Sequence, residues 1–414
     1  MNDTSFLGTN ISLVKAHNLR AVLLTLLHDQ QVSRVELAEK TSLSTTTITN
    51  LIDELLQNDI VEEEGVEMVQ GPRQVGRPRT ALRLVPDARF AVGVHIGIGV
   101  LRTAVTNLYA NILCSRMSDF NIAAPAEEVL DQIVGEIERC VAESGIDRKK
   151  IIGVGIGASG LIDVKEGVCL VAPSLNWRDV PVLEYIQEKL NLLVTVDNNV
   201  RCMALGEAFF GIGKNNSPLV FVYGRGGVGA GIVVDGMILR GSAAGAGEIG
   251  HLVIKHQGGD LCRCGKRGCL ETLISESVLV REAMFIAEEN PGSLVYHYLN
   301  REDLGKPIDR IFAAARDGDQ AIKNMIAERA HYLGIGLSYL VNILDPELIL
   351  LGGVFAQGKE FILPPAEATM RELAFAGLGE KVRLDATSFG WRAGVIGACA
   401  LALTTFFYLE PVEI

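Results

Sequence analysis

The sequence predicts an α/β protein in which a small helical module precedes a larger, glycine-rich body. Three observations support this prediction. The chain has 414 residues, enough for two or three domains of about 100 to 200 residues each. Residues 1–85 show helical periodicity and few glycines. Farther on, glycines cluster in segments 153–160, 224–231 and 241–250, which indicates tight turns and close approach of the backbone to a ligand.

The composition excludes several classes of protein. Hydrophobic residues make up 48% of the chain and charged residues 21%, which is typical of a globular protein. The net charge of −12 argues against a protein that coats nucleic acid, but it permits a small DNA-binding module on an acidic body. The sequence begins without a basic and apolar leader, and it has no uninterrupted run of about 18 apolar residues. We therefore expect a cytoplasmic protein without membrane insertion.

Apolar spacing predicts three helices near the N-terminus. A first helix is indicated by residues spaced three and four apart, namely Leu19, Val22, Leu23, Leu26 and Leu27. Ser33 and Glu36 have the spacing of a capping box, which opens a short second helix. Ser44 is a good N-cap for a third helix. The buried stripe of this third helix would contain Ile48, Leu51, Ile52, Leu55 and Leu56.

The free face of the third helix is polar. Two short helices joined by a tight turn, the second presenting small polar side chains, are typical of a helix-turn-helix unit that reads the major groove. The candidate DNA-contacting residues are Ser44, Thr45, Thr46, Thr49 and Asn50. Because this helix contains no Lys or Arg, base readout would rest on Thr and Asn contacts or on DNA shape. An ordinary packing unit of three amphipathic helices is the alternative.

A two-stranded wing is predicted after the third helix. The extended segments IVEEE and TALRLV flank the basic stretch GPRQVGRPR. Arg73, Arg77, Arg79 and Arg83 concentrate positive charge there, and GRPR resembles the short arginine arms that enter narrow minor grooves. We therefore expect residues 1–85 to form a winged helix-turn-helix DNA-binding domain, with Arg73, Arg77 and Arg79 contacting operator DNA.

Three of the eight cysteines lie close together in the segment CRCGKRGCLE. With a preceding histidine they form a Cys3His set suited to tetrahedral, structural zinc: His251, Cys262, Cys264 and Cys269. The glycine-rich, polar surroundings argue against inert core cysteines, and His256 is a rival ligand. The other cysteines lie in apolar stretches and are expected in the core, namely Cys114, Cys140, Cys169, Cys202 and Cys399.

Several motifs resemble the ROK family, which comprises sugar kinases and sugar-responsive repressors. GEIGH followed by CRCGKRGCLE looks like the family signature, and DNNVRCMALGEAFFG and LDPELILLGG also occur in family order between about residue 88 and the end. A winged helix-turn-helix in front resembles the repressor branch, which includes xylose, glucose and N-acetylglucosamine regulators. The resemblance implies a two-lobed, actin-like (ribonuclease H-like) α/β body with a sugar cleft between its lobes.

The same resemblance divides the body into two lobes. Residues 88–200 are expected to form the first lobe, and a C-terminal helix over 388–408 is expected to return to it. Residues 201–387 are expected to form the second lobe, with the zinc site and a dimerisation surface. We expect a homodimer or a dimer of dimers.

Two parts of the family's kinase chemistry are altered. The kinases use a D-x-G-x-T loop in which the carboxylate helps to organise Mg²⁺, whereas HIGIG places His95 at that position. Counting back from the Gly-Glu pair at the end of the base motif puts Asn198 first and Asn199 at the catalytic Asp. A neutral amide is not a general base at pH 7, so no catalytic residue is expected. Shifting the register to make Asp197 the base would spoil the spacing.

By the same resemblance, the monosaccharide site contains Asn198, Asn199, Glu248, His251 and Glu271, while Ser174 stands where Asn is common. One ring nitrogen of His251 can bind zinc while the other faces a sugar hydroxyl, so zinc would fix the wall of the sugar site. The sequence therefore predicts a sugar-responsive repressor that binds its effector without phosphorylating it. An ATP-dependent sugar kinase and a module that docks on another protein are the alternatives.

Overall fold

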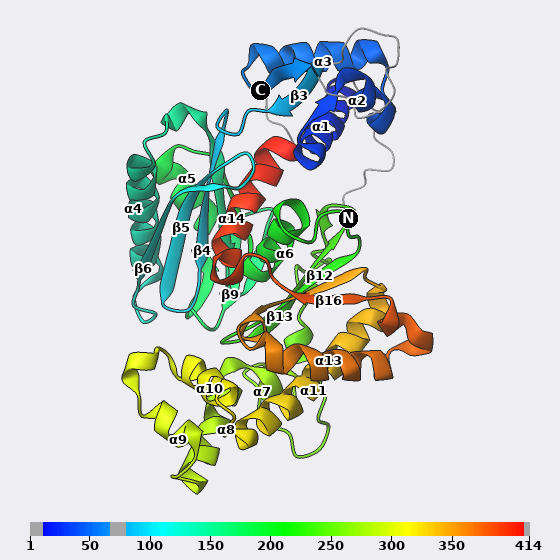
Figure 1. The fold of residues 1–414 in the computed structure, drawn as a ribbon. Coiled ribbons are helices and arrows are strands. Elements are labelled where there is room, and N and C mark those ends of the chain that lie inside the picture. The colour runs from blue at the N-terminus through cyan, green and yellow to red at the C-terminus, as the bar shows by residue number, and fades with distance from the viewer. Residues whose placement is uncertain (1–10, 67–79, 410–414) are drawn as a thin grey trace.

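The structure, a computed structural model, describes residues 11–66 and 80–409. Within these residues, the N-terminal unit combines helices with a small antiparallel sheet of order β1-β3-β2. Its elements are α1 (Ile11–Asp29), β1 (Val32–Ser33), α2 (Arg34–Thr41), α3 (Thr45–Gln57), β2 (Val61–Val66) and β3 (Thr80–Leu84). Figure 1 shows this unit at one end of the molecule. The order of helices followed by paired strands confirms the expected winged helix-turn-helix arrangement.

Local sequence signals position the helices of this unit. The Ser33 hydroxyl accepts a hydrogen bond from the backbone N–H of Glu36, and the Glu36 carboxylate accepts one from the backbone N–H of Ser33, so the predicted capping box is confirmed. The Ser44 hydroxyl caps α3 by accepting from the Thr47 backbone N–H at 3.1 Å. The predicted apolar faces of α1 and α3 are buried, except that Leu56 is half-buried.

The first lobe is built on a five-stranded sheet of order β11-β7-β4-β5-β6. Strands β11, β7 and β4 are parallel, whereas β5 and β6 are antiparallel to their neighbours. Helices α4 and α5 pack together beside this sheet, and a small sheet of order β10-β9-β8 adjoins it. The elements are β4 (Phe90–Ile96), β5 (Val100–Asn107), β6 (Ile112–Asp119), α4 (Ala126–Ser144), β7 (Ile151–Ala158), β8 (Leu161–Asp163), β9 (Val168–Ala172), β10 (Trp177–Val180), α5 (Val182–Leu190) and β11 (Val194–Asn198).

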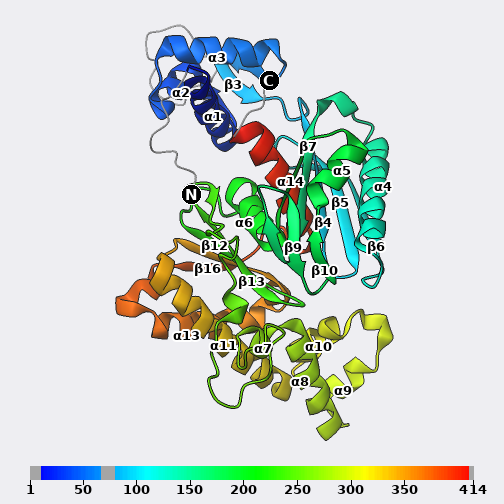
Figure 2. The same ribbon diagram turned by 180° about the vertical axis from the view of Figure 1, so that it is seen from behind.

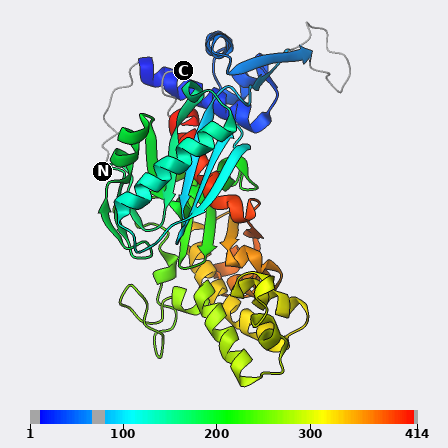
Figure 3. The same ribbon diagram turned by 90° about the vertical axis from the view of Figure 1, so that its left-hand side faces the viewer.

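The second lobe is built on another five-stranded sheet, of order β14-β13-β12-β15-β16. Helices α11 and α13 pack against each other, and α7–α10 form a helical group at the end of the molecule opposite the N-terminal unit (Figure 3). The elements are β12 (Leu219–Gly224), β13 (Val228–Val234), β14 (Met237–Ile238), α7 (Glu271–Ile274), α8 (Glu276–Glu289), α9 (Leu294–Leu299), α10 (Pro307–Arg316), α11 (Gln320–Leu344), β15 (Leu348–Gly353), α12 (Val354–Gln357), α13 (Lys359–Leu373) and β16 (Arg383–Ala386).

Two buried helices connect the sheets. Helix α6 (Asn199–Phe210) packs on strands of both sheets and on α14 (Ala393–Leu403), which lies against β4 and β7 (Figure 2). Close contact with α14 depends on Gly155 in β7, because a Cβ there would lie 2.0 Å from the Ala398 carbonyl oxygen. The lobe boundary expected at residue 200 falls within α6, a helix that contacts both lobes.

The C-terminal helical segment is a core element. By length and composition, Gly390–Tyr408 is the one candidate membrane span in the described part of the chain, but 72% of its apolar window is buried inside the fold. It comprises the 3₁₀ turn η6 (Gly390–Arg392), α14 and the π-helical turn η7 (Thr404–Tyr408). Its apolar character is explained by packing on the first sheet and on α6.

Candidate functional site

A large cavity lies between the two lobes. It has a volume of about 1310 Å³ and is lined by the first-lobe segment 95–102, the start of α6, the turn after β12 and residues 246–251. The lining includes a set of polar and charged side chains, namely Ser159, Ser174, Asn198, Asn199, Glu248, His251, Arg263 and Glu271. A cavity with a few convergent polar groups is the usual form of a small-molecule site.

The predicted cysteine and histidine ligands converge beside this cavity. One donor atom from each of His251, Cys262, Cys264 and Cys269 lies within 4.8 Å of all the others. The Cys262 sulfur is 3.5 Å from His251 Nδ1, and the Cys264 and Cys269 sulfurs are 3.6 Å apart. Tetrahedral zinc with ordinary bond lengths separates its donors by about 3.5–3.8 Å. The donor set therefore fits a zinc ion, and the rival ligand His256 is not part of it.

The backbone of the cysteine loop explains this convergence. Isolated antiparallel bridges join Val253 to Cys269 and Leu261 to Arg267, so the loop folds back on itself. Gly268 has φ +72°, and a Cβ there would lie 1.8 Å from the Lys255 carbonyl oxygen. Only glycine combines this left-handed conformation with such close backbone packing.

Ionisation of the three thiols is coupled to the binding of a metal ion among them. Burial, followed by neighbouring thiols, raises the pKa of Cys269 to about 12. Burial likewise raises the pKa of Cys262, whereas a hydrogen bond from the Lys266 backbone lowers the pKa of Cys264. Three adjacent thiolates repel one another unless a metal ion neutralises them, and metal binding releases the thiol protons.

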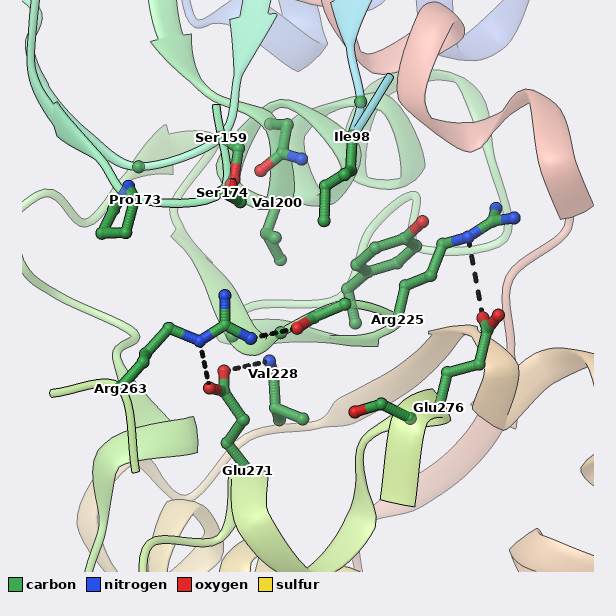
Figure 4. Close-up of a pocket in the computed structure, with 18 of the residues that line it drawn as sticks. Ile98, Ser159, Pro173, Ser174, Val200, Arg225, Val228, Arg263, Glu271 and Glu276 are labelled. Carbon is green, nitrogen blue, oxygen red and sulfur yellow. Dashed lines mark hydrogen bonds and ion pairs between the residues drawn. The ribbon is translucent and has the colours of Figure 1, made fainter. Parts of the chain in front are cut away.

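Glu271 is held rigidly at the wall of the cavity. One carboxylate oxygen accepts from the Val228 backbone N–H at 3.0 Å, and the other pairs with Arg263 Nε at 2.8 Å (Figure 4). Arg263 also donates to the Gly226 carbonyl oxygen, so it ties the cysteine loop to the turn before β13. The sequence analysis missed Arg263, although its position between Cys262 and Cys264 was a usable signal.

The two asparagines at the end of β11 have different surroundings. Asn198 caps α6: its side-chain oxygen accepts from the backbone N–H groups of Val200 and Arg201, and its amide donates to the Gly160 carbonyl oxygen. The Asn199 side chain has no hydrogen-bond partner among the described residues, and it lines the cavity. Asn199 is thus free to bind a ligand, while the Asn198 side chain is largely committed to the protein.

Asp197 is engaged in a buried ion-pair network. Its carboxylate is 0% exposed and pairs with Arg201 Nε at 2.7 Å and with Arg240 Nε at 2.8 Å. Arg201 also donates to the Ala244 carbonyl oxygen at 2.7 Å, which links the start of α6 to the loop after β14. Asp197 does not line the cavity, so it is not placed to accept a proton from a ligand there. This agrees with the sequence register that put Asn199 at the base position.

Other polar groups that line the cavity include neutral hydroxyls and an acidic carboxylate, both of which can bind hydroxyl groups of a ligand. The hydroxyl oxygens of Ser159 and Ser174 are 3.2 Å apart (Figure 4). Glu248 is exposed, and its carboxylate lies 3.9 Å from His251 Nε2, on the side of the ring away from the cysteines.

Of the remaining five cysteines, four are buried as expected, whereas Cys114 is half-buried.

The surface of α3 that was predicted to contact DNA is open. Its polar residues are all exposed, namely Ser44, Thr45, Thr46, Thr49 and Asn50. Arg73, Arg77 and Arg79 lie outside the described residues. Arg83 is within the described residues: the β2–β3 pairing sets it opposite Glu62, and its guanidinium pairs with the Glu62 and Glu64 carboxylates.

Family comparisons agree with this architecture. A model described as the ROK family matches residues 91–405, and a model described as winged helix-turn-helix DNA-binding matches residues 16–62. The chain belongs to the ROK family. The expected fold class, a winged helix-turn-helix in front of a ROK body, is therefore confirmed.

Both repressors and kinases of the ROK family are similar to this chain. A xylose repressor of Caldicellulosiruptor bescii is 30% identical over 395 residues, which cover 95% of this chain and 97% of the repressor. The crystal structure of a ROK transcriptional regulator, a homolog of Escherichia coli Mlc, has a TM-score of 0.80 and 28% identity, with coverage of 94% of this chain and 96% of that one. A Streptomyces griseus ROK glucokinase in complex with glucose and AMPPNP has a TM-score of 0.67 and 29% identity, with coverage of 75% and 98%. The kinase similarity therefore covers a smaller share of this chain than the regulator similarity.

Proposed function

We propose that this protein is a sugar-responsive, DNA-binding transcriptional repressor of carbohydrate-metabolism genes, and that its ROK body binds a monosaccharide without phosphorylating it. One observation carries the proposal: a winged helix-turn-helix unit is joined to a kinase-like cleft that has His95 and Asn199 where catalysis requires carboxylates. The similarity to a xylose repressor over nearly the whole chain supports it. We infer that the protein acts in the cytoplasm, where operator DNA is found.

The proposed absence of catalysis rests on proton chemistry. A sugar hydroxyl becomes a nucleophile when a nearby base accepts its proton, and the Asn199 amide has no useful basicity. Asp197, the nearest carboxylate along the chain, is occupied by two arginines. A sugar seated at Asn199 would therefore be bound and released unchanged. The alternative is an ATP-dependent sugar kinase, favoured by the similarity to a ROK glucokinase.

We propose that Asn198, Asn199, Glu248, His251 and Glu271 form the monosaccharide site. Asn199, Glu248 and the Nε2 face of His251 would contact hydroxyls directly, because carboxylates and amides can engage neighbouring hydroxyls of a polyol. Asn198 and Glu271 would mainly hold the backbone of the site in place, since their polar atoms already have protein partners. A hydroxyl of the wrong epimer would leave a polar group of the site unpaired, which is the basis of selectivity.

We propose that His251, Cys262, Cys264 and Cys269 hold a structural zinc ion. The Nδ1 atom of His251 faces the thiols and its Nε2 atom faces Glu248, so one imidazole would belong to both sites. Bound zinc would supply the positive charge that keeps the thiols ionised. The protein's own residues would then orient the imidazole and, through Arg263, the Glu271 carboxylate.

We propose that operator DNA is read by Ser44, Thr45, Thr46, Thr49 and Asn50 of α3, with Arg73, Arg77 and Arg79 of the wing on phosphates or in the minor groove. Several basic residues of the described N-terminal unit are already paired with acidic side chains. This supports the assignment of phosphate contacts to the wing arginines. Lys15 pairs with Glu54, and Arg34 with Asp53. The wing arginines would therefore supply much of the salt-dependent affinity.

We propose that an exposed apolar surface of the second lobe mediates the homodimer. The end of α11 and the neighbouring turn after α13 carry Ile343 and Phe375, which are 76% and 74% exposed. Tyr339 and Leu373 lie on the same two helices and are also exposed. The Phe375 backbone N–H donates to the Asn342 side chain at 2.8 Å, so the end of α11 and the turn after α13 are in direct contact. Exposed groups of large apolar residues are typical of interfaces.

We propose that α14 and α1 link sugar binding to operator affinity. Helix α14 begins beside the cleft, where a Cβ on Gly394 would lie 2.5 Å from the His95 ring, and η7 at its other end contacts α1. The Tyr408 hydroxyl donates to the Leu108 carbonyl oxygen at 2.6 Å. Helix α1 also reaches the second lobe through Arg20 and Met237. A movement of one lobe relative to the other would therefore change the position of the N-terminal unit.

The test is a gel shift with DNA from upstream of carbohydrate genes, repeated with a panel of monosaccharides. Specific binding should survive competitor DNA, and one sugar should change operator affinity at least tenfold, which corresponds to about 1.4 kcal/mol of differential binding. An Asn199→Ala variant should bind operator normally and lose the sugar response. Operator binding that no sugar in the panel alters, together with phosphorylation of a sugar, would support the kinase alternative.

A further inference from the structure

A buried ion-pair network joins the two lobes outside the cavity that lies between them. Asp197 lies on β11, an edge strand of the first sheet, and Arg240 follows β14, an edge strand of the second sheet. The 2.8 Å bond from Arg240 Nε to Asp197 Oδ2 is therefore a contact between lobes. Asp197, Arg201 and Arg240 are called the interlobe network below. None of the three lines the cavity, so the network reaches a ligand there only through other residues.

The interlobe network holds the start of α6. The Asp197 Oδ1 atom accepts hydrogen bonds from the Asn198 backbone N–H at 2.6 Å and from Arg201 Nε at 2.7 Å. These two donors lie on either side of Asn199 in the chain, and Asn199 is the first residue of α6. One carboxylate therefore fixes the backbone that presents the Asn199 amide to the cavity.

The same network holds the loop that leads to Glu248. This loop comprises residues 240–247 and is called the 240–247 loop below. Arg201 Nη1 donates to the Ala244 carbonyl oxygen at 2.7 Å, in the middle of the loop. Glu248 follows the loop directly and lines the cavity. The interlobe network thus connects the backbone of α6 with the backbone that carries a second hydroxyl-binding side chain.

Two observations indicate that Arg201 holds the 240–247 loop in its conformation. Ala244 has φ +54°, in the left-handed region that residues other than glycine, asparagine and aspartate rarely adopt. Such a conformation persists where surrounding contacts hold it, and the Arg201 bond is made to this residue. The Arg201 side chain is 3% exposed, and its Nη2 atom is buried without a hydrogen-bond partner among the described residues. Losing either of its two bonds would therefore leave another buried donor unsatisfied.

We propose that Arg201 and Arg240 are positioning residues of the monosaccharide site, which hold Asn199 and Glu248 at the spacing that sugar binding requires. This inference rests on the proposed function, because it takes a monosaccharide as the ligand of these two residues. Neither arginine touches the sugar. Arg240 ties the second lobe to the Asp197 carboxylate, and Arg201 ties the 240–247 loop to α6. Side chains held in place before the ligand arrives lose less conformational freedom on binding, which raises affinity.

The experiment replaces Arg240 with Gln. The Arg240 side chain is 34% exposed, and Asp197 keeps its bond to Arg201, so the substitution removes the contact between lobes without leaving a buried charge alone. The zinc-loaded full-length protein is titrated calorimetrically with the monosaccharide that the wild type binds best, at a temperature where unfolding curves show each variant to be folded. Arg240→Gln should raise the dissociation constant at least fivefold. Hydrogen–deuterium exchange of the 240–247 loop should be faster than in the wild type, with the sugar bound.

Lysine variants separate positioning from charge alone. Arg240 uses one nitrogen in the network, whereas Arg201 uses two, Nε toward Asp197 and Nη1 toward Ala244. A single ammonium group can replace one of these donor positions but not two. Arg240→Lys should therefore bind the sugar within twofold of the wild type, whereas Arg201→Lys should bind it at least fivefold more weakly.

Arg316→Gln is the matched control. It also removes an arginine whose Nε pairs with a carboxylate, that of Glu360 at 2.7 Å, but both partners belong to the second lobe and neither lines the cavity. This variant should change the dissociation constant of the sugar less than twofold and leave the exchange of the 240–247 loop unchanged.

The inference is overturned if folded Arg240→Gln and folded Arg201→Lys bind the sugar within twofold of the wild type. It is also overturned if Arg316→Gln weakens binding as much as Arg240→Gln does. A wild-type protein that binds no monosaccharide would overturn the proposed function together with this inference. Wild-type binding that the network variants leave unchanged would overturn the positioning role alone.

Discussion

Replacing Asp197 with Asn is expected to destabilise the protein by about 3–5 kcal/mol, the cost of breaking a buried ion pair by removing one partner. The substitution keeps the size of the side chain but removes its charge. The Arg201 side chain is 3% exposed, so its guanidinium would remain buried without a counter-charge. Arg240 is 34% exposed and can turn toward water, so its contribution is smaller. Most of the loss therefore comes from Arg201.

The assay is urea unfolding followed by circular dichroism, combined with hydrogen–deuterium exchange of α6. Asp197 lies directly before Asn198, the cap of α6, so faster exchange should begin in the first turn of that helix and monosaccharide affinity should fall. Asp303→Asn is the matched control, because the Arg301–Asp303 pair is exposed and its loss should leave unfolding unchanged. A stability of Asp197→Asn within 1 kcal/mol of the wild type would refute the inference that this carboxylate compensates Arg201.

Three further predictions concern zinc, DNA and catalysis. Cys264→Ser should release zinc and weaken monosaccharide binding, because the metal holds the loop that carries Arg263; zinc content by mass spectrometry and sugar titration measure both effects. Arg77→Ala or Arg79→Ala should weaken operator binding and lower the slope of log affinity against log salt by about one unit each. Asn199→Asp should not restore sugar phosphorylation, because His95 still replaces the metal-organising carboxylate; a coupled assay with ATP and Mg²⁺ measures turnover.

Each of these three predictions has a control and a contradicting outcome. Cys169→Ser changes a buried cysteine distant in sequence from the zinc group, so this variant should retain zinc. Unchanged sugar affinity in zinc-free Cys264→Ser would show that sugar binding does not depend on the metal. Arg139→Ala, which changes an exposed side chain on α4, should keep the wild-type salt slope. A wild-type slope in both wing variants would exclude the wing arginines from phosphate contact. Measurable turnover by Asn199→Asp would mean that the first loop still handles phosphate and metal.

Local signals made part of the structure predictable from sequence. The capping box of α2 and the buried stripe of α3 depend on residues within one or two helical turns, so spacing alone identified them. The cysteine group was predictable because Cys262, Cys264 and Cys269 lie in one short loop. The family resemblance supplied the lobes and the sugar cleft, which composition and periodicity do not specify.

Long-range contacts were not predictable in the same way. Asp197 and Arg201 are four residues apart on adjoining elements, but the second partner, Arg240, comes from a loop 43 residues away. The opposition of His95 and Arg102 follows from the β4–β5 register, which the sequence analysis did not assign. The ion pairs of Arg83 with Glu62 and Glu64 likewise depend on the β2–β3 pairing, which the sequence analysis did not assign.

The most direct test of the central claim uses one preparation of the zinc-loaded protein and the monosaccharide that binds it best. Operator affinity is measured with and without that sugar in the presence of ATP and Mg²⁺. The sugar is then recovered, and its molecular mass is determined by mass spectrometry. A repressor that senses without converting should change its operator affinity at least tenfold and return the sugar unmodified. Recovery of phosphorylated sugar in many-fold excess over protein, with operator affinity unchanged, would contradict it.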